Sequence, residues 1–214
     1  MKMNIVMNDQ SQDGPSRSKQ SKIVRDPAYY CAKDMTIQIG TANSLAQTGW
    51  YYEHFTRKDA VRLLQKEPEG TFLIRDSSDS RYLYSLSVKT GRDATSARIL
   101  YHKGKFQMDC NENIRAKMPT FDSAVGLVDF YARMTQMGKS NAGRWLENSG
   151  KSDLPIVLQK PKLNCVSDLR HLCRLSINRN LPKTLSKTKV LNSMDKLPIP
   201  RPLKSYLKEY PYIN

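Results

Sequence analysis

The sequence predicts an α+β fold, with a central antiparallel sheet flanked by two helices and a small helical unit after it. Segments between residues 71 and 108 have the apolar or alternating pattern of strands. Apolar residues recur at helical spacing both before and after these strands, so a helix is available for each face of the sheet. Residues 161–214 contain few large apolar side chains and cannot bury much surface alone.

The N-terminal part of the chain shows little pattern. Residues 1–31 are polar and lack sustained periodicity, which predicts a disordered segment. A weak apolar pattern over residues 32–48 predicts a short helix that packs on the following domain. That domain covers residues 49–160 and begins with an aromatic cluster at Trp50.

The elements of this domain follow from local signals. Thr56 is a hydroxyl cap for a first helix, and Asp59, three residues later, completes an imperfect capping box. Pro68 ends that helix. Strands are then predicted over residues 71–75, 82–88, 96–101 and 106–108.

The remaining predicted elements are a helix, a loop and a strand. The second helix begins at residue 119 or 120 and carries a wide apolar face. A loop rich in Gly, Ser and Lys covers residues 136–153, and residues 154–158 form a closing strand.

Residues 161–214 form a second unit. Four residues recur at helical spacing and predict its first helix: Leu169, Leu172, Cys173 and Ile177. Residues 178–196 are polar and irregular, and no element is predicted there. A proline-rich run over residues 197–202 is extended, and a last apolar stripe that includes Leu207 predicts a terminal helix.

Arg75 is the candidate binding residue because it follows an apolar strand. Residues 71–74 do not alternate in polarity, so both faces of this strand should be covered. A buried guanidinium keeps its proton and costs several kcal/mol when unpaired, so it needs an anion. Asp76 points to the other side of the strand. The hydroxyl and N–H groups of a loop at Ser77 and Ser78 can hold phosphate or carboxylate.

Three further residues can extend this site. Ser85 lies on the next strand, Arg98 on the third, and Arg57 at the positive end of the first helix, so the group predicts a dianion site. In the alternative, Arg75 pairs with a core carboxylate such as Asp109 or Asp122, and the other arginines are solvated. The residues alone leave both interpretations open.

Composition limits the function classes. The net charge is +15, but residues 49–160 mix acidic and basic side chains, which argues against a nucleic-acid partner. Four cysteines without C-x-x-C spacing and only three histidines argue against a metal site. Apolar runs stay below the ~18 residues of a membrane span, and no signal peptide is recognisable. We therefore expect no cofactor, no membrane insertion and a reducing, cytoplasmic compartment.

One spacing in the sequence matches the signature of an enzyme class. Cys173 and Arg179 have the Cys-x5-Arg spacing of protein tyrosine phosphatases. That chemistry needs a thiolate in a glycine-rich loop whose N–H groups hold phosphate. The intervening residues lack glycine and have a helical pattern, so we predict no enzyme. A kinase is excluded because its glycine-rich and catalytic loops are missing from the sequence.

Residues 49–160 resemble a Src-homology-2 (SH2) domain. The resemblance is carried by Trp50-Tyr51, the helix at 57–66, the run Gly70-Thr71-Phe72-Leu73-Ile74-Arg75-Asp76-Ser77, and Phe121-Asp122-Ser123. It implies that Arg75 grips both free oxygens of a phosphotyrosine. It further implies the remaining phosphotyrosine-binding residues: Ser77, Ser78, Ser85, Arg98 and Arg57.

Residues 161–214 resemble a suppressor of cytokine signalling (SOCS) box. Residues 168–177 match its elongin-binding segment, with Leu169 and Cys173 as the Leu-x-x-x-Cys core. The run Leu197-Pro198-Ile199-Pro200 resembles its Leu-Pro-Leu-Pro cullin-binding segment. In this order, behind an SH2-like domain, the motifs resemble the SOCS family, nearest its cytokine-inducible and second-member branch.

The family resemblance implies a non-enzymatic adaptor. The SH2-like domain would capture a phosphotyrosine segment of a receptor or signalling protein. The second unit would bind elongin B, elongin C and a cullin-5-type scaffold, bringing the captured protein to ubiquitin transfer and inhibiting cytokine receptor and JAK-STAT signalling. The elongin-binding residues would be Leu169, Leu172, Cys173 and Ile177, and the cullin-binding residues Leu197, Pro198, Ile199 and Pro200. The alternative is a competitor that occupies phosphotyrosine sites without ubiquitination.

Overall fold

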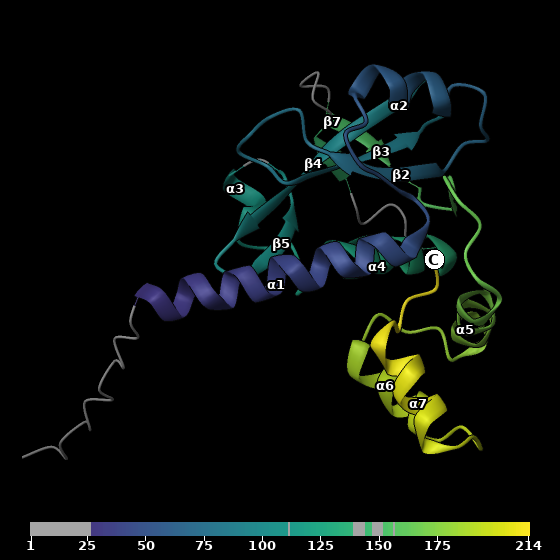
Figure 1. Cartoon of the computed structure of the whole chain (residues 1–214). Coiled ribbons are helices and arrows are strands. Elements are labelled where there is room, and N and C mark those ends of the chain that lie inside the picture. Colours follow the sequence, from purple (N-terminus) through teal and green to yellow (C-terminus); the bar gives the residue numbers. More distant parts are fainter. Residues whose placement is uncertain (1–26, 111, 139–143, 147–151, 156) are drawn as a thin grey trace, which may run out of the picture.

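The structure is a computed structural model that describes residues 27–110, 112–138, 144–146, 152–155 and 157–214. A sheet lies at the centre, with helices α1 and α4 on one side of it and α2 on the other (Figure 1). The helices α5, α6 and α7 lie beside it. The predicted fold class is confirmed: a sheet flanked by helices is followed by a helical unit.

The sheet is mixed rather than purely antiparallel. Its strands, in spatial order, are β1 (Tyr51–Tyr52), β2 (Thr71–Asp76), β3 (Tyr84–Lys89), β4 (Ala94–His102) and β5 (Lys105–Met108). From β2 to β5 the pairing is antiparallel, as predicted. Both β1 and β8 (Lys160–Pro161) pair with β2 in parallel. Helix α2 (Arg57–Leu64) is the crossover that returns the chain in the same direction between β1 and β2.

The two faces of β2 pack in different surroundings. Phe72 and Ile74 belong to the main core between the sheet and α4 (Ala124–Gln136). Leu73 points the other way and packs with Leu64 of α2. This alternation leaves Arg75, two residues after Leu73, on the α2 side of the sheet.

Capping side chains set where the two domain helices begin. The capping box at α2 is complete, since Thr56 accepts from the N–H of Asp59, whose carboxylate accepts from the N–H of Thr56. Helix α4 begins later than predicted, because Ser123 is its cap and accepts from the N–H of Gly126 at 3.0 Å. Asp122 therefore precedes the helix and pairs with Lys105.

The N-terminal helix is longer than predicted. Helix α1 (Pro27–Thr48) begins at Pro27, so residues 27–31, which the sequence assigned to a disordered segment, are helical. Residues 1–26 lie outside the described part. Leu45 of α1 is fully buried in the main core.

Three other segments differ from the sequence prediction. A short helix, α3 (Glu112–Arg115), lies where no element was predicted. In the predicted loop of residues 136–153, β6 (Arg144–Leu146) pairs with β7 (Ser152–Pro155). The closing strand predicted over residues 154–158 is therefore replaced by the end of β7 and by β8, with residue 156 outside the described part.

The C-terminal unit contains one more helix than predicted. Its helices are α5 (Leu169–Asn180), α6 (Lys187–Asp195) and α7 (Arg201–Glu209). Helix α6 lies in the segment predicted to be irregular. Ser186 caps it, and Val190 and Met194 are buried against Leu207 of α7. No described helix is long and apolar enough to cross a membrane.

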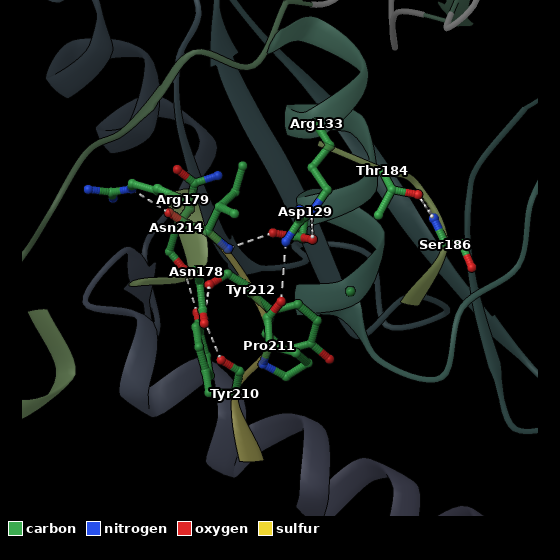
Figure 2. Close-up of polar contacts among 12 residues, drawn as sticks. Asp129, Arg133, Asn178, Arg179, Thr184, Ser186, Tyr210, Pro211, Tyr212 and Asn214 are labelled. Carbon is green, nitrogen blue, oxygen red and sulfur yellow. Dashed lines mark hydrogen bonds and ion pairs between the residues drawn. The ribbon is translucent and has the colours of Figure 1, made fainter. Parts of the chain in front are cut away.

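The C-terminal residues join this unit to α4 (Figure 2). Asp129 of α4 accepts a hydrogen bond from the N–H of Ile213 at 2.8 Å, and Arg133 donates to the carbonyl of Pro211 at 3.2 Å. From the other side, Asn178 of α5 donates to the carbonyls of Tyr210 and Tyr212. The last residues thus lie between α4 and α5 and bond to both.

Candidate functional site

Arg75 lies at the centre of a row of polar residues on the α2 side of the sheet. Its side chain is almost fully buried, with 3% of the residue exposed. In the register of the sheet, Arg75 lies opposite Ser85 of β3, and Ser85 lies opposite Arg98 of β4. Residues that are directly opposite point to the same face, so the structure brings these three predicted residues together.

The Arg75 guanidinium is held at one end and free at the other. Its Nε donates to Ser87 Oγ at 3.3 Å, and its Nη1 donates to the carbonyl of Asp76 at 2.8 Å and reaches Ser78 Oγ at 3.5 Å. Among the described residues, Nη2 makes no hydrogen bond. The uncommitted Nη2 of this buried cation can donate a charge-assisted hydrogen bond to an oxyanion.

The alternative, in which a core carboxylate neutralises Arg75, is contradicted. Asp109 accepts from the hydroxyl of Tyr82 at 3.0 Å, and Asp122 pairs with Lys105 at 2.6 Å. Asp76 faces the other side of β2, as predicted, where its carboxylate accepts from the hydroxyl of Tyr51 at 2.6 Å. Within the described chain, Arg75 makes no ion pair.

Arg57 brings a second positive charge to the same place. It is the first residue of α2 and is exposed. Burial, and next the charge of Arg57, lower the pKa of Arg75. Two cations beside the N-terminus of α2 favour a bound anion.

The loop after β2 supplies the hydroxyl groups. Ser78 is exposed and faces Arg75, while Ser77 Oγ accepts from the N–H of Asp79 at 3.2 Å. Asp79 itself forms an ion pair with Arg98, at 3.6 Å between Oδ2 and Nη2. Arg98 is therefore not simply solvated, and Ser77 holds the loop.

Sequence reasoning did not identify the residues that support Arg75. Ser87 accepts from Arg75 and is bonded to Ser96 Oγ at 2.9 Å, and both serines are buried. The signal was present, because Ser87 lies two residues after Ser85 and so shares its face. The role of Asp79 was also missed, because its neighbour Arg98 lies far along the chain.

Helix α5 has its apolar side chains on the outside. Its buried face consists mainly of polar residues: His171, Arg174 and Asn178, together with Leu175. The four predicted elongin-binding residues are all exposed, with Leu169 at 76%, Leu172 at 40% and Ile177 at 38%, and with Cys173 between them. An exposed apolar helix face is costly in water unless a partner covers it. The predicted apolar stripe of α5 therefore faces away from the core of the chain.

The predicted cullin-binding run alternates between buried and exposed positions. Leu197 and Ile199 are partly buried and pack on the cluster around Met194 and Leu207. Pro198 and Pro200 are exposed, and Pro200 is the cap residue of α7. The two prolines are therefore the part of this run that a partner can contact.

The phosphatase pattern lies on a helix. Cys173 and Arg179 both belong to α5, and Arg179 Nε donates to the carbonyl of Ile213 at 2.7 Å. The loop that phosphatase chemistry needs is therefore replaced by helical backbone. In the part of the chain that the structure describes, no three His, Cys, Asp or Glu residues are grouped so that they could hold a metal.

Comparison with known proteins matches both halves of the chain. Residues 50–131 match the family model of the SH2 domain, and residues 165–208 match that of the SOCS box. "Suppressor of cytokine signaling 2" of Homo sapiens is 39% identical over 168 residues, which cover 78% of each chain. "Cytokine-inducible SH2-containing protein" of Gallus gallus is 34% identical over 203 residues, which cover 88% of this chain and 74% of the other.

A solved structure is similar to part of this chain. The solution structure of the SH2 domain of a CRK/CRKL homologue from Monosiga brevicollis is 25% identical, with a TM-score of 0.38, and covers 54% of this chain and 86% of that one.

Proposed function

The chain belongs to the suppressor of cytokine signalling family, near the branch of suppressor of cytokine signaling 2 and the cytokine-inducible SH2-containing protein, and on this premise we propose that it is a non-enzymatic adaptor that inhibits cytokine signalling. Its SH2 domain binds a phosphotyrosine segment of a receptor or signalling protein. Its SOCS box binds elongin B, elongin C and a cullin-5-type scaffold, so that the captured protein is brought to ubiquitin transfer in the cytoplasm.

One observation supports the phosphotyrosine half of the proposal above all others. Arg75 is buried, has no carboxylate partner in the described chain, and makes hydrogen bonds there through Nε and Nη1 but not through Nη2. Arg75 grips the phosphate, with Arg57, Arg98, Ser77, Ser78 and Ser85 around it. A buried arginine can form two parallel charge-assisted hydrogen bonds to a phosphate, whereas a carboxylate-paired one has no free edge to offer.

The inverted polarity of α5 supports the ligase half. Leu169 and Cys173 are exposed one turn apart on the same face, which suits docking of the helix into an apolar groove. Leu172 and Ile177 extend this face and complete the elongin-binding set. Pro198 and Pro200, in the run that includes Leu197 and Ile199, present the cullin-binding surface.

Co-purification of the full chain with elongins B and C, followed by titration with a phosphotyrosine peptide library, tests both halves. A stable ternary complex that binds phosphorylated peptides and ignores unphosphorylated ones is expected. Binding to phosphopeptides without elongin association would leave a competitor for phosphotyrosine sites. Peptide binding that does not depend on phosphate would refute the role of Arg75.

A further inference from the structure

The loop that follows Arg75 contains a carboxylate that points at the binding site. Asp79 lies between Ser78 and Ser80, with its side chain 22% exposed, and its Oδ2 is 3.6 Å from Arg98 Nη2. This distance is an ion-pair contact and is too long for a good hydrogen bond. One of the proposed phosphate ligands therefore already faces an anion that belongs to the chain.

Asp79 is held in this position by the loop itself. Its Oδ1 accepts from the backbone N–H of Arg81 at 3.1 Å and from Arg81 Nε at 3.0 Å, while its Oδ2 accepts from Arg81 Nη2 at 2.7 Å. Its own N–H donates to Ser77 Oγ. Hydrogen bonds from Arg81 lower the pKa of Asp79 to about 2, so the carboxylate is charged at every physiological pH.

Arg98 is held much more loosely than Asp79. Its guanidinium lies 5.1 Å from the centre of the Tyr82 ring, a cation–π contact, and its ion-pair contact is the long one to Asp79. Asp79 has a bidentate partner in Arg81 and does not depend on Arg98. Arg98 can therefore leave Asp79 while the loop keeps its shape.

A phosphoryl group bound across Arg75 and Arg98 would meet this carboxylate. The row Arg75–Ser85–Arg98 spans neighbouring strands, and Asp79 lies at the Arg98 end of it. The negative charge of Asp79 repels the phosphoryl dianion. It also pairs with Arg98, the cation that the dianion would contact, so both effects weaken phosphate binding.

We propose that Asp79 is an internal counter-ion of the phosphotyrosine site: it occupies Arg98 when no phosphoryl group is bound, and phosphotyrosine must displace Arg98 from it. This inference rests on the proposed function and adds a regulating residue to the same site. Asp79 lowers the affinity for phosphotyrosine and keeps Arg98 from binding weaker anions, such as carboxylates of unphosphorylated segments. The hydrogen bonds from Arg81 keep the Asp79 carboxylate in place when Arg98 moves to the phosphate.

The test is the Asp79→Asn variant of the full chain, titrated with free O-phosphotyrosine and followed by two-dimensional NMR. This small probe reports the phosphate site without the loops that read the flanking peptide. Asparagine keeps an oxygen that accepts from the N–H of Arg81, so the loop turn is retained. We expect about three- to tenfold tighter binding, the size of effect for loss of one neighbouring charge near the surface. Glu69→Gln, which removes an equal charge from an exposed position before β2, is the matched control and should change affinity by less than about twofold.

Arg98→Gln completes a double-mutant cycle. Arg98→Gln should weaken phosphotyrosine binding in both backgrounds. The fold-loss should be at least about threefold larger in the Asp79→Asn background than in the unmodified chain, because Arg98 there has no competing anion. Unchanged or weaker binding by Asp79→Asn, or the same Arg98→Gln loss in both backgrounds, would overturn the inference. In that case a full loss of binding by Arg75→Lys would leave the proposed function intact, whereas an unmodified chain that ignores phosphotyrosine would overturn both.

Discussion

The backbone N–H of Ile213 donates to the carboxylate of Asp129, 2.8 Å away and 84 positions earlier in the chain. The same carboxylate accepts from Arg133 Nε at 2.7 Å, and all three groups are buried. A fully buried charge is tolerated only with such partners. This contact therefore ties the SOCS box tail to the SH2 domain, and the stability of the two halves should be coupled.

Asp129→Asn should destabilise the full chain by about 3 kcal/mol, because it leaves the buried guanidinium of Arg133 without its counter-charge. Urea unfolding followed by circular dichroism measures this change. Asp122→Asn, which breaks the exposed pair with Lys105, should cost less than about 1 kcal/mol. Equal costs for the two variants would show that the buried pair does not hold the tail.

Stability should fall between pH 7.5 and pH 5.5 through His171. Its Nδ1 accepts from Arg174 Nη2 at 2.6 Å, and burial, followed by the charge of Arg174, lowers its pKa below the ordinary 6.5. Below pH 6.5 the unfolded chain then binds a proton that the folded chain does not, so unfolding becomes easier as pH falls, by at most about 1.4 kcal/mol per pH unit.

The His171→Asn variant isolates this effect. Urea unfolding at pH 7.5, 6.5 and 5.5 should give a steeper pH dependence for the unmodified chain than for the variant. Parallel curves for the two proteins would assign the pH dependence to other groups.

Arg75→Lys should weaken binding of a phosphotyrosine peptide by at least about 30-fold, or 2 kcal/mol. Lysine keeps the charge but loses the fork that contacts two phosphate oxygens. Isothermal titration calorimetry measures this loss. Arg92→Lys, an exposed position in the turn between β3 and β4, is the matched control and should bind as the unmodified chain does. Full affinity of Arg75→Lys would exclude a bidentate contact.

Leu169→Asp should abolish co-purification with elongins B and C while phosphotyrosine affinity stays unchanged. The side chain is 76% exposed, so the substitution alters the proposed docking face and leaves the core intact. Ile39→Asp, at a 54% exposed apolar position on α1, controls for a new surface charge. Retained elongin association by Leu169→Asp would remove this face from the interface, and loss by both variants would mean that the assay responds to charge alone.

Gly70→Ala should destabilise the SH2 domain by more than Gly138→Ala. Both glycines have positive φ, at +80° and +69°, so both variants should cost about 1 kcal/mol for backbone strain. Only at Gly70 would the new Cβ lie 2.7 Å from Gln159 Cγ, next to the segment that forms β8. Thermal unfolding should separate the two variants, and equal Tm values would mean that Gln159 moves aside without cost.

Local signals predicted helix starts best where a few neighbouring residues decide them. Thr56 and Asp59 set the start of α2 because both groups of the capping box lie within three residues. The predicted start of α4 was wrong because local criteria accept three residues as the first or capping residue of this helix: Pro119, Thr120 and Ser123. Asp122 pairs with Lys105 of strand β5, and the local sequence does not show this contact. Helix α6 was missed because only Val190 and Met194 mark its buried side.

By itself, the sequence determined the order of α2, strands β2 to β5 and α4, the burial of Arg75 at the end of an apolar strand, and the helical character of the C-terminal unit. These properties follow from spacing and polarity along a few neighbouring residues. Only the tertiary structure decided that Ser87 holds Arg75, that Asp79 faces Arg98, that α5 turns its apolar side outward, and that Ile213 reaches Asp129. Each of these contacts joins different elements of the fold, and the backbone path that brings such residues within a few ångströms is set by packing of the whole core rather than by any local pattern.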